Sequence, residues 1–372
     1  MHYDIHIEKS SISRVSQVDF DNIPFGRIFS DHMFEAEYRD GNWCNCSIVP
    51  FHSLEIHPAF TALHYGQSIF EGLKAYKSIN GIPQIFRPDR NANRFNKSAT
   101  RMAMPEVPEE LFLTALHELI VLDSDWIPTH EGSALYIRPL MFATDEIVGI
   151  KPADSFKFII FTSPVGLYYP RPVKVLVAQE HVRAFRGGVG TAKAAGNYAA
   201  TMLALKNARK EGYDQMLWTD GVEFKYIQEI GTMNVFFVID DKVITPSLDD
   251  GTILDGITRD SVIQLLKDKN VPIEIRRINI DEIYEAHKNG KLNDFFGTGT
   301  AATISHISDI GYRGENLHLP DPEIRTISNQ LKQELEDIKT SRIPDRHNWL
   351  IKVGEFGGLP NQALHPTQNA GS

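Results

Sequence analysis

The chain has 372 residues, more than one hydrophobic core usually organises, so two domains are expected. It is 42% hydrophobic and 23% charged, as globular proteins are, and its net charge of -10 without a Lys/Arg-rich run argues against nucleic acid or an anionic membrane as partner. Two cysteines are too few for a disulfide scaffold, and with no leader-like or membrane-spanning apolar segment a cytoplasmic protein is expected.

Residues 1–164 are expected to form an α/β domain, the smaller of the two. Residues 133–143, "SALYIRPLMFA", and 156–164, "FKFIIFTSP", are rich in β-formers and predict strands. Residues 108–123, "PEELFLTALHELIVLD", predict a helix, because their apolar residues recur at helical spacing.

Residues 165–176 are expected to be an interdomain loop. Prolines at 170 and 172 with a glycine at 166 make this run a poor helix or strand interior. Tyr168 and Tyr169 lie within it, so the crossing between the domains could close over a ligand.

Residues 177–353 are expected to form a second, larger α/β domain in which strands alternate with helices. The predicted strands cover residues 173–179, 214–220, 233–240 and 272–278, the first of them overlapping the end of the loop. The predicted helices cover residues 197–212, 258–270, 281–290 and 323–341. Residues 354–372 are rich in Gly, Pro, Asn and Gln, and we expect them to be a disordered tail or an expression remnant.

The stretch "RAFRGGVGTAKAAGNY" surrounds a single lysine, Lys193, with glycine and alanine. A nucleotide-binding P-loop needs a Ser or Thr after the lysine to hold magnesium, but Ala194 stands there. One alternative is a flexible loop with its lysine in water. The other is that small residues on both sides of the lysine let a planar ligand approach a reactive amine. A reactive lysine of this kind suggests an imine with pyridoxal phosphate.

Pyridoxal phosphate would need a phosphate cradle and an acid partner for its ring nitrogen. "FFGTGTAATIS" offers backbone amides and the Thr300 hydroxyl, and "ILDGITRDSVIQLL" places Ile257 and Thr258 at a predicted helix start, where an anion is favoured. Glu229, in "KYIQEIGTMNVFF", is an acidic residue leading into an apolar strand. It is the candidate partner of the ring nitrogen.

In this order and at these separations, "GGVGTAKAAGNY", "QEIGTMN", "DGITRDS" and "FFGTGTA" resemble the signature series of the branched-chain-amino-acid aminotransferases. The upstream segments "ALHYGQSIFEGLKAYK", "IFRPDRNANRF" and "ALYIRPL" resemble the same family, so the likeness covers about residues 25 to 352. The resemblance implies the fold of type IV pyridoxal-phosphate enzymes, with mixed α/β sheets in two domains, the C-terminal one binding the cofactor.

By this resemblance, Lys193 is the catalytic residue, joined to the cofactor and later moving the substrate Cα proton. Glu229 would pair with the pyridine nitrogen, and Tyr198 would hydrogen-bond the ring oxygen. The phosphate would be bound by Arg94, Ile257, Thr258 and Thr300.

The resemblance also implies a substrate site formed by Phe25, Tyr65, Tyr136, Arg138, Tyr168, Thr232 and Ala301. The Thr300 and Ala301 amides would lie near the substrate carboxylate, and Arg138 would help to receive the distal carboxylate of glutamate. Aromatic walls suit an aliphatic side chain.

The implied reaction is ping-pong transamination of L-leucine, L-isoleucine and L-valine with 2-oxoglutarate, without a metal, in a homodimer with sites close to the subunit boundary. A D-amino-acid aminotransferase or an aminodeoxychorismate lyase of the same fold is the nearest alternative, although "YIRPL" and "GTMN" favour the branched-chain prediction. A non-catalytic small-ligand binding protein is a third possibility.

Overall fold

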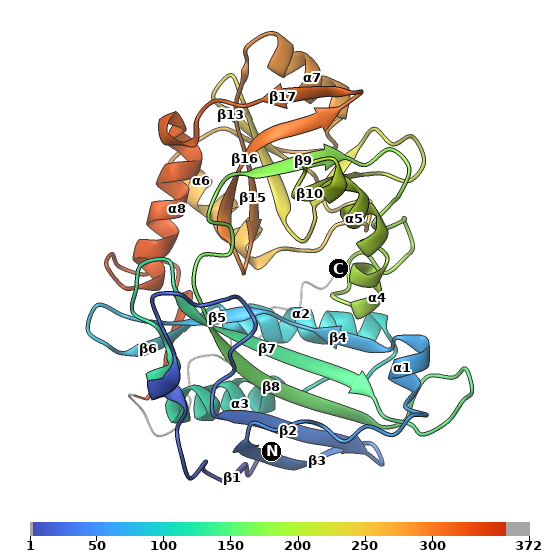
Figure 1. Ribbon diagram of the computed structural model, residues 1–372, viewed down its shortest axis with the longest axis vertical. Helices are drawn as coiled ribbons and strands as arrows, with labels where there is room; N and C mark the ends of the chain where they lie inside the picture. Colours follow the sequence, from blue (N-terminus) through green and yellow to red (C-terminus); the bar gives the residue numbers. More distant parts are fainter. Residues whose placement is uncertain (1–2, 355–372) are drawn as a thin grey trace, which may run out of the picture.

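The computed structural model describes residues 3–354, which form two nine-stranded sheets with helices, one above the other in Figure 1. The strands are β1 (His6–Ile7), β2 (His32–Arg39), β3 (Asn42–Pro50), β4 (Ser68–Phe70), β5 (Leu73–Lys77), β6 (Pro83–Phe86), β7 (Ala134–Ala143), β8 (Phe156–Val165), β9 (Val173–Val177), β10 (Gln215–Thr219), β11 (Ile227–Ile230), β12 (Asn234–Ile239), β13 (Lys242–Thr245), β14 (Ile273–Ile275), β15 (Leu292–Gly299), β16 (Thr303–Tyr312), β17 (Glu315–His318) and β18 (Leu350–Lys352). The helices are α1 (Thr61–Tyr65), α2 (Pro88–Arg101), α3 (Glu109–Leu122), α4 (Ala195–Ala199), α5 (Met202–Lys210), α6 (Ile257–Asp268), α7 (Ile280–Lys288) and α8 (Thr326–Lys339), with 3₁₀ turns η1 (Val15–Gln17), η2 (Ser124–Trp126) and η3 (Pro322–Ile324).

The first sheet has the strand order β1-β3-β2-β8-β7-β5-β6-β18, and β4 pairs with β7. Helices α2 and α3 pack on it and share its core, in which Phe95 and Phe112 from the helices meet Phe158 of β8. The predicted strands and helix of this half are confirmed by β7, β8 and α3, each within one residue at either end. The β2–β3 hairpin and α2 had no predicted counterpart.

The second sheet has the order β11-β10-β9-β16-β15-β12-β13-β14, and β17 pairs with β16. Neighbouring residues of a strand face opposite sides. The stacked rings of Phe236 and Phe296 therefore join the core with α6 and α8, whereas Phe237 and Phe295 join the core on the α7 side. Both mixed sheets carry helices, so the predicted α/β class is confirmed.

Three predicted boundaries differ from the structure. The predicted loop at 165–176 includes the start of β9, which pairs with β10 and β16. The predicted helix 197–212 is divided into α4 and α5, and at the break the Thr201 amide donates to the Tyr198 carbonyl at 3.1 Å, three residues back instead of the four of an α-helix. Strand β18 lies inside the predicted C-terminal domain, yet it pairs with β6 of the first sheet.

The chain thus crosses between the two halves twice, once between β8 and β9 and again after α8 (Figure 1). The predicted tail lies outside the described residues except for Gly354. In the described part of the chain, no helix combines the length and the apolar character that crossing a membrane requires.

Candidate active site

A cavity of about 380 Å³ is lined by residues of both halves of the molecule. It contains all of the predicted site residues except Tyr65 and Glu229: Phe25, Arg94, Tyr136, Arg138, Tyr168, Lys193, Tyr198, Thr232, Ile257, Thr258, Thr300 and Ala301. A larger cavity, about 730 Å³, shares Tyr168, Ala301 and Ala302 with it but is not lined by Lys193. We place the candidate site in the smaller cavity, because the reactive amine lies there.

Lys193 is fixed by its backbone at the junction of the two halves. Its amide donates to Ser98 Oγ of α2 at 2.9 Å, and its carbonyl accepts from the amide of Phe70 in β4 at 3.1 Å. Its side chain enters the cavity, where Nζ donates to Tyr198 Oη at 2.9 Å and lies 4.9 Å from the centre of the Phe70 ring. The flexible, water-exposed loop considered above does not describe this lysine, which is partly buried and hydrogen-bonded.

Glu229 lies in β11 and is buried. One carboxylate oxygen accepts from the Leu254 amide at 2.6 Å and lies 3.0 Å from the Arg183 guanidinium. Burial raises the pKa of Glu229, and the charge of Arg183 opposes that shift. The carboxylate borders a small cavity of about 20 Å³ that shares Tyr198, Thr232 and Leu254 with the main one.

Arg94 lies in α2 and is held by Glu71, a fully buried residue for which the sequence had suggested no role. The guanidinium donates from Nε and Nη2 to the two Glu71 oxygens at 2.7 and 2.8 Å, and from Nη1 to the Asp255 carbonyl at 3.0 Å. Although burial opposes ionisation, the charge of Arg94 keeps the pKa of Glu71 below its usual range. Arginine has five N–H groups, so two are left for an anion in the cavity.

The start of α6 faces the same end of the cavity. Gly256 precedes the helix, and a Cβ atom there would overlap the side chain of Asn234, so the backbone is approached closely from that side. Ile257 and Thr258 begin the 12-residue helix, where free amides and the helix dipole favour an anion.

The rings of Phe25, Tyr136 and Tyr168 form an aromatic wall of the cavity. Phe25 makes edge contacts with Tyr136 and Tyr168, with ring centres 5.4 and 4.7 Å apart. Arg138 donates from Nη2 to Tyr136 Oη at 3.0 Å and lies over the Phe70 ring, and its Nε has no hydrogen-bond partner in the described part of the chain.

Two turns complete the cavity. Thr232 lies in the turn between β11 and β12, and Thr300 and Ala301 lie in the turn between β15 and β16. Lys74 of β5 donates to the Ala301 carbonyl at 2.7 Å across the two halves. Burial, with Lys339 nearby, lowers the pKa of Lys74 to about 7. Lys74 was not predicted as a site residue, because the carbonyl it binds lies 227 residues away in the chain.

Tyr65 is placed elsewhere. It ends α1, is 41% exposed and does not line the cavity of its own chain. The predicted substrate contact of Tyr65 is therefore absent within one chain.

The residues present fit pyridoxal phosphate. A lysine amine, a buried carboxylate and an anion-binding end with two free arginine N–H groups are the three features that this cofactor requires. Thr298 also lines the cavity, and its buried hydroxyl has no hydrogen-bond partner among residues 3–354.

The family model for class IV amino-transferases matches residues 68–310, and the chain belongs to this family. It is 46% identical over 343 residues to a probable branched-chain-amino-acid aminotransferase of Staphylococcus epidermidis, covering 91% of this chain and 95% of that protein. It is 43% identical over 340 residues to branched-chain-amino-acid transaminase 1 of Bacillus subtilis, covering 90% and 95%. The structure is similar to the T.th. branched-chain amino acid aminotransferase complexed with N-(5'-phosphopyridoxyl)-L-glutamate, with a TM-score of 0.68, 27% identity, and coverage of 86% of this chain and 98% of that one.

Proposed function

We propose that this chain is a pyridoxal-phosphate-dependent branched-chain-amino-acid aminotransferase. It transfers the amino group of L-leucine, L-isoleucine or L-valine to 2-oxoglutarate, giving the branched-chain 2-oxo acid and L-glutamate. The observation that carries this proposal is the cavity shared by both halves, which is lined by Lys193, Arg94 and the three aromatic rings, while Glu229 lines the small cavity that has Tyr198, Thr232 and Leu254 in common with it. The names of the relatives reported above support the same reaction.

The chemistry that bound pyridoxal phosphate supplies is condensation with an amine and withdrawal of electrons from the carbon beside it. Arg94, Thr300 and the amides of Ile257 and Thr258 would hold its phosphate. Glu229 would hold the ring nitrogen in its protonated form, a role that the nearby Arg183 supports by favouring the ionised carboxylate. Tyr198, already hydrogen-bonded to the lysine amine, would hold the ring oxygen.

Lys193 would act in two ways. Its amine would hold the cofactor in the resting protein, and as a free amine it would accept the Cα proton of the substrate. The Tyr198 hydroxyl, 2.9 Å from the amine, positions it for this transfer. Both substrates would occupy the same cavity in turn, so the first product would leave before the second substrate enters.

The other end of the cavity would recognise substrates. Phe25, Tyr136 and Tyr168 enclose an aliphatic side chain, and the Thr300 and Ala301 amides with the Thr232 turn receive the substrate carboxylate. Arg138, whose Nε has no partner, would help to bind the distal carboxylate of glutamate.

We also propose a homodimer. Apolar side chains are exposed on α1 and on the neighbouring β7–β8 loop: Leu63, Tyr65, Ile147, Val148 and Ile150. A second copy covering this surface would remove it from water. Tyr65 belongs to the surface, so its predicted substrate contact requires the second copy. Light scattering after gel filtration should give twice the chain mass.

The purified protein with pyridoxal phosphate should show a visible absorption band that is lost on borohydride reduction, and it should transaminate leucine with 2-oxoglutarate. Lys193→Ala should lose the band and more than about a thousandfold in turnover. Its fold should persist, because the bonds to Ser98 and Phe70 use only backbone atoms of residue 193. A protein without the band would be a non-catalytic binder, and a chiral assay that finds only D-amino acids would support the rival aminotransferase.

A further inference from the structure

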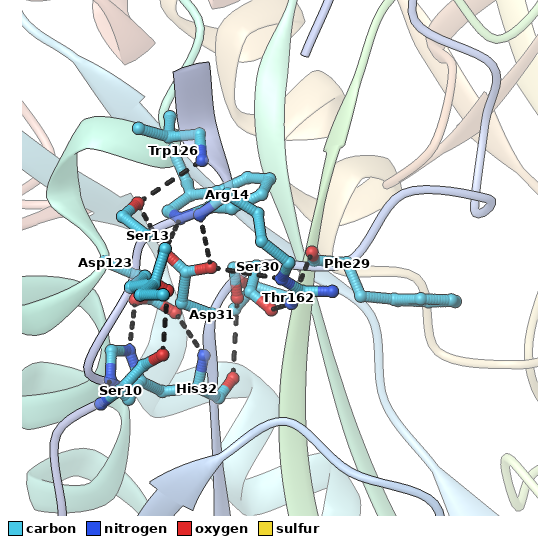
Figure 2. Close-up of polar contacts among 12 residues, drawn as sticks. Ser10, Ser13, Arg14, Phe29, Ser30, Asp31, His32, Asp123, Trp126 and Thr162 are labelled. Atoms are coloured by element: carbon cyan, nitrogen blue, oxygen red, sulfur yellow. Dashed lines mark hydrogen bonds and ion pairs between the residues drawn. The ribbon is translucent and has the colours of Figure 1, made fainter. Parts of the chain in front are cut away.

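Residues 15–28 form a loop whose two ends are fastened together by a cluster of polar contacts, drawn in Figure 2. Arg14, at one end, donates from Nη2 to the carbonyls of Phe29 and Ser30 at 3.3 and 2.6 Å. Its backbone N and Nε both donate to Asp31 Oδ1, at 3.0 and 3.3 Å. The contacts of Arg14 with Phe29, Ser30 and Asp31 close the loop at its base, and we call them the neck.

Asp31 is the centre of the neck. It is 5% exposed, and its second oxygen accepts from Ser13 Oγ at 2.6 Å and from Trp126 Nε1 at 2.9 Å. Although burial opposes ionisation, these hydrogen bonds lower the pKa of Asp31. The adjacent residue is also held, because Ser30 Oγ lies 2.6 Å from Thr162 Oγ1 of β8.

Beside the neck, His32 Nδ1 lies 2.6 Å from Asp123, and His32 Nε2 accepts from the Ser10 amide at 2.8 Å (Figure 2). Accepting at Nε2 places the ring proton on Nδ1. This pair resembles a catalytic dyad, but both ring nitrogens are used to fasten the chain, so we assign it to anchoring the residues before the loop.

The tip of the loop carries Phe25 to the substrate cavity. Phe25 makes edge contacts with Tyr136 and Tyr168 and is 37% exposed. The backbone hydrogen bonds of the loop are local, such as those from Val18 to Val15 and from Asn22 to Asp19. Its 3₁₀ turn aside, the loop contains no helix or strand of the described structure. Val15, Val18 and Ile28 pack against the core near the base of the loop, and Asp21 pairs with His130 in an exposed contact at 3.1 Å. The position of Phe25 itself depends on its ring contacts and on the fastened ends of the loop.

We propose that Arg14 and Asp31 are positioning residues for the substrate pocket: by closing the neck, they fix Phe25 as the wall that selects large aliphatic side chains. The inference rests on the function proposed above. A compact loop with joined ends keeps its tip in few positions, whereas opening the neck removes the contacts at its base and lets the tip move Phe25 off Tyr136 and Tyr168. The KM for leucine, whose side chain would fill the pocket, should therefore change more than the KM for alanine, whose methyl group would not.

The test uses Arg14→Ala, since the Arg14 side chain is half exposed and its loss should not unfold the protein. Steady-state kinetics with pyridoxal phosphate and 2-oxoglutarate would compare leucine and alanine as donors. We expect KM for leucine to rise about tenfold, with kcat for leucine and KM for alanine each within about twofold. Phe25→Ala should likewise raise KM for leucine and leave kcat and the KM for alanine nearly unchanged. In the double variant, Arg14→Ala should cause no further rise in KM for leucine. Asp309→Asn is the control, a buried aspartate that binds Ser308, Asn316 and His318 near the β16–β17 turn.

Hydrogen exchange of the peptide covering residues 15–28 gives a second measurement, with faster exchange expected in Arg14→Ala at an unchanged Tm. Equal losses for leucine and alanine, or additive effects of Arg14→Ala and Phe25→Ala, would overturn the proposal. If the unaltered protein transaminates nothing, the proposed function fails instead. That result is seen before any variant is compared.

Discussion

Arg183 Nη2 lies 3.0 Å from Glu229 Oε1, and both side chains are almost completely buried. Arg183 also donates to the carbonyls of Gly190 and Thr252, at 3.3 and 2.8 Å. It therefore joins the start of the glycine-rich run that contains Lys193 to the buried carboxylate of Glu229. One cation both supports the backbone of the site and favours the charged form of its acid.

Arg183→Met should weaken cofactor binding. Without the cation, burial acts on Glu229 unopposed, and its pKa rises further. We expect the Kd for pyridoxal phosphate to rise about tenfold or more, by absorbance titration, and the acidic limb of the kcat profile to move to higher pH. Arg313→Met removes a mostly exposed ion pair with Asp281 and should change neither. An unshifted acidic limb would show that Glu229 does not depend on Arg183.

Glu71→Gln tests whether Arg94 serves a phosphate. The amide cannot hold the guanidinium in its paired orientation and leaves a buried positive charge unbalanced. We expect the Kd for pyridoxal phosphate to rise about tenfold while the Kd for pyridoxal, which lacks the phosphate, stays within about twofold. A similar loss for both compounds would mean that Glu71 supports the whole cavity rather than its anion-binding end.

Regular elements in contiguous apolar runs were predictable from the sequence. Residues 108–123 and 156–164 correspond closely to α3 and β8, since period and composition are local properties. Strand β18 was not predictable, because three residues carry too little pattern and their partner β6 lies more than 250 residues away. Tertiary pairing alone assigns such a short strand to a sheet.

The site residues that belong to recognisable sequence motifs were predictable. Their order pointed to Lys193, and most of the residues named with it line one cavity. Glu71 and Arg183 were missed although both lie within quoted motifs, because each acts through a charge, Arg94 or Glu229, that folding brings to it. A buried ionised group requires a partner, and that requirement does not identify the partner in the sequence.

His306 should make the protein less stable in acid. Burial, with Arg325 and Lys332 nearby, lowers the pKa of His306 to about 4, whereas the unfolded chain binds this proton near pH 6.5. Lowering the pH through this window favours the unfolded chain, so the free energy of unfolding should fall by up to about 3 kcal/mol between pH 6.5 and 4.

Urea unfolding at several pH values would measure this loss as the difference between the unaltered protein and His306→Gln. The variant keeps a polar side chain opposite Ser328 Oγ, which lies 3.0 Å from His306 Nε2, but cannot bind the proton. Parallel stability curves for the two proteins below pH 6.5 would exclude His306 as the source.

Gly72→Ala should displace the Tyr136 ring in the aromatic wall of the cavity. A Cβ atom at position 72 would overlap Tyr136 Oη and lie 2.9 Å from its Cζ, so the Tyr136 ring must shift. That ring contacts Phe25 and accepts the hydrogen bond from Arg138. Overpacking of this kind costs about 1–3 kcal/mol of stability, and because the moved ring faces the substrate, KM for leucine should rise about tenfold with a smaller change in kcat. A lower Tm with an unchanged KM would mean that Tyr136 moves without changing the pocket, and its place in the substrate wall would have to be abandoned.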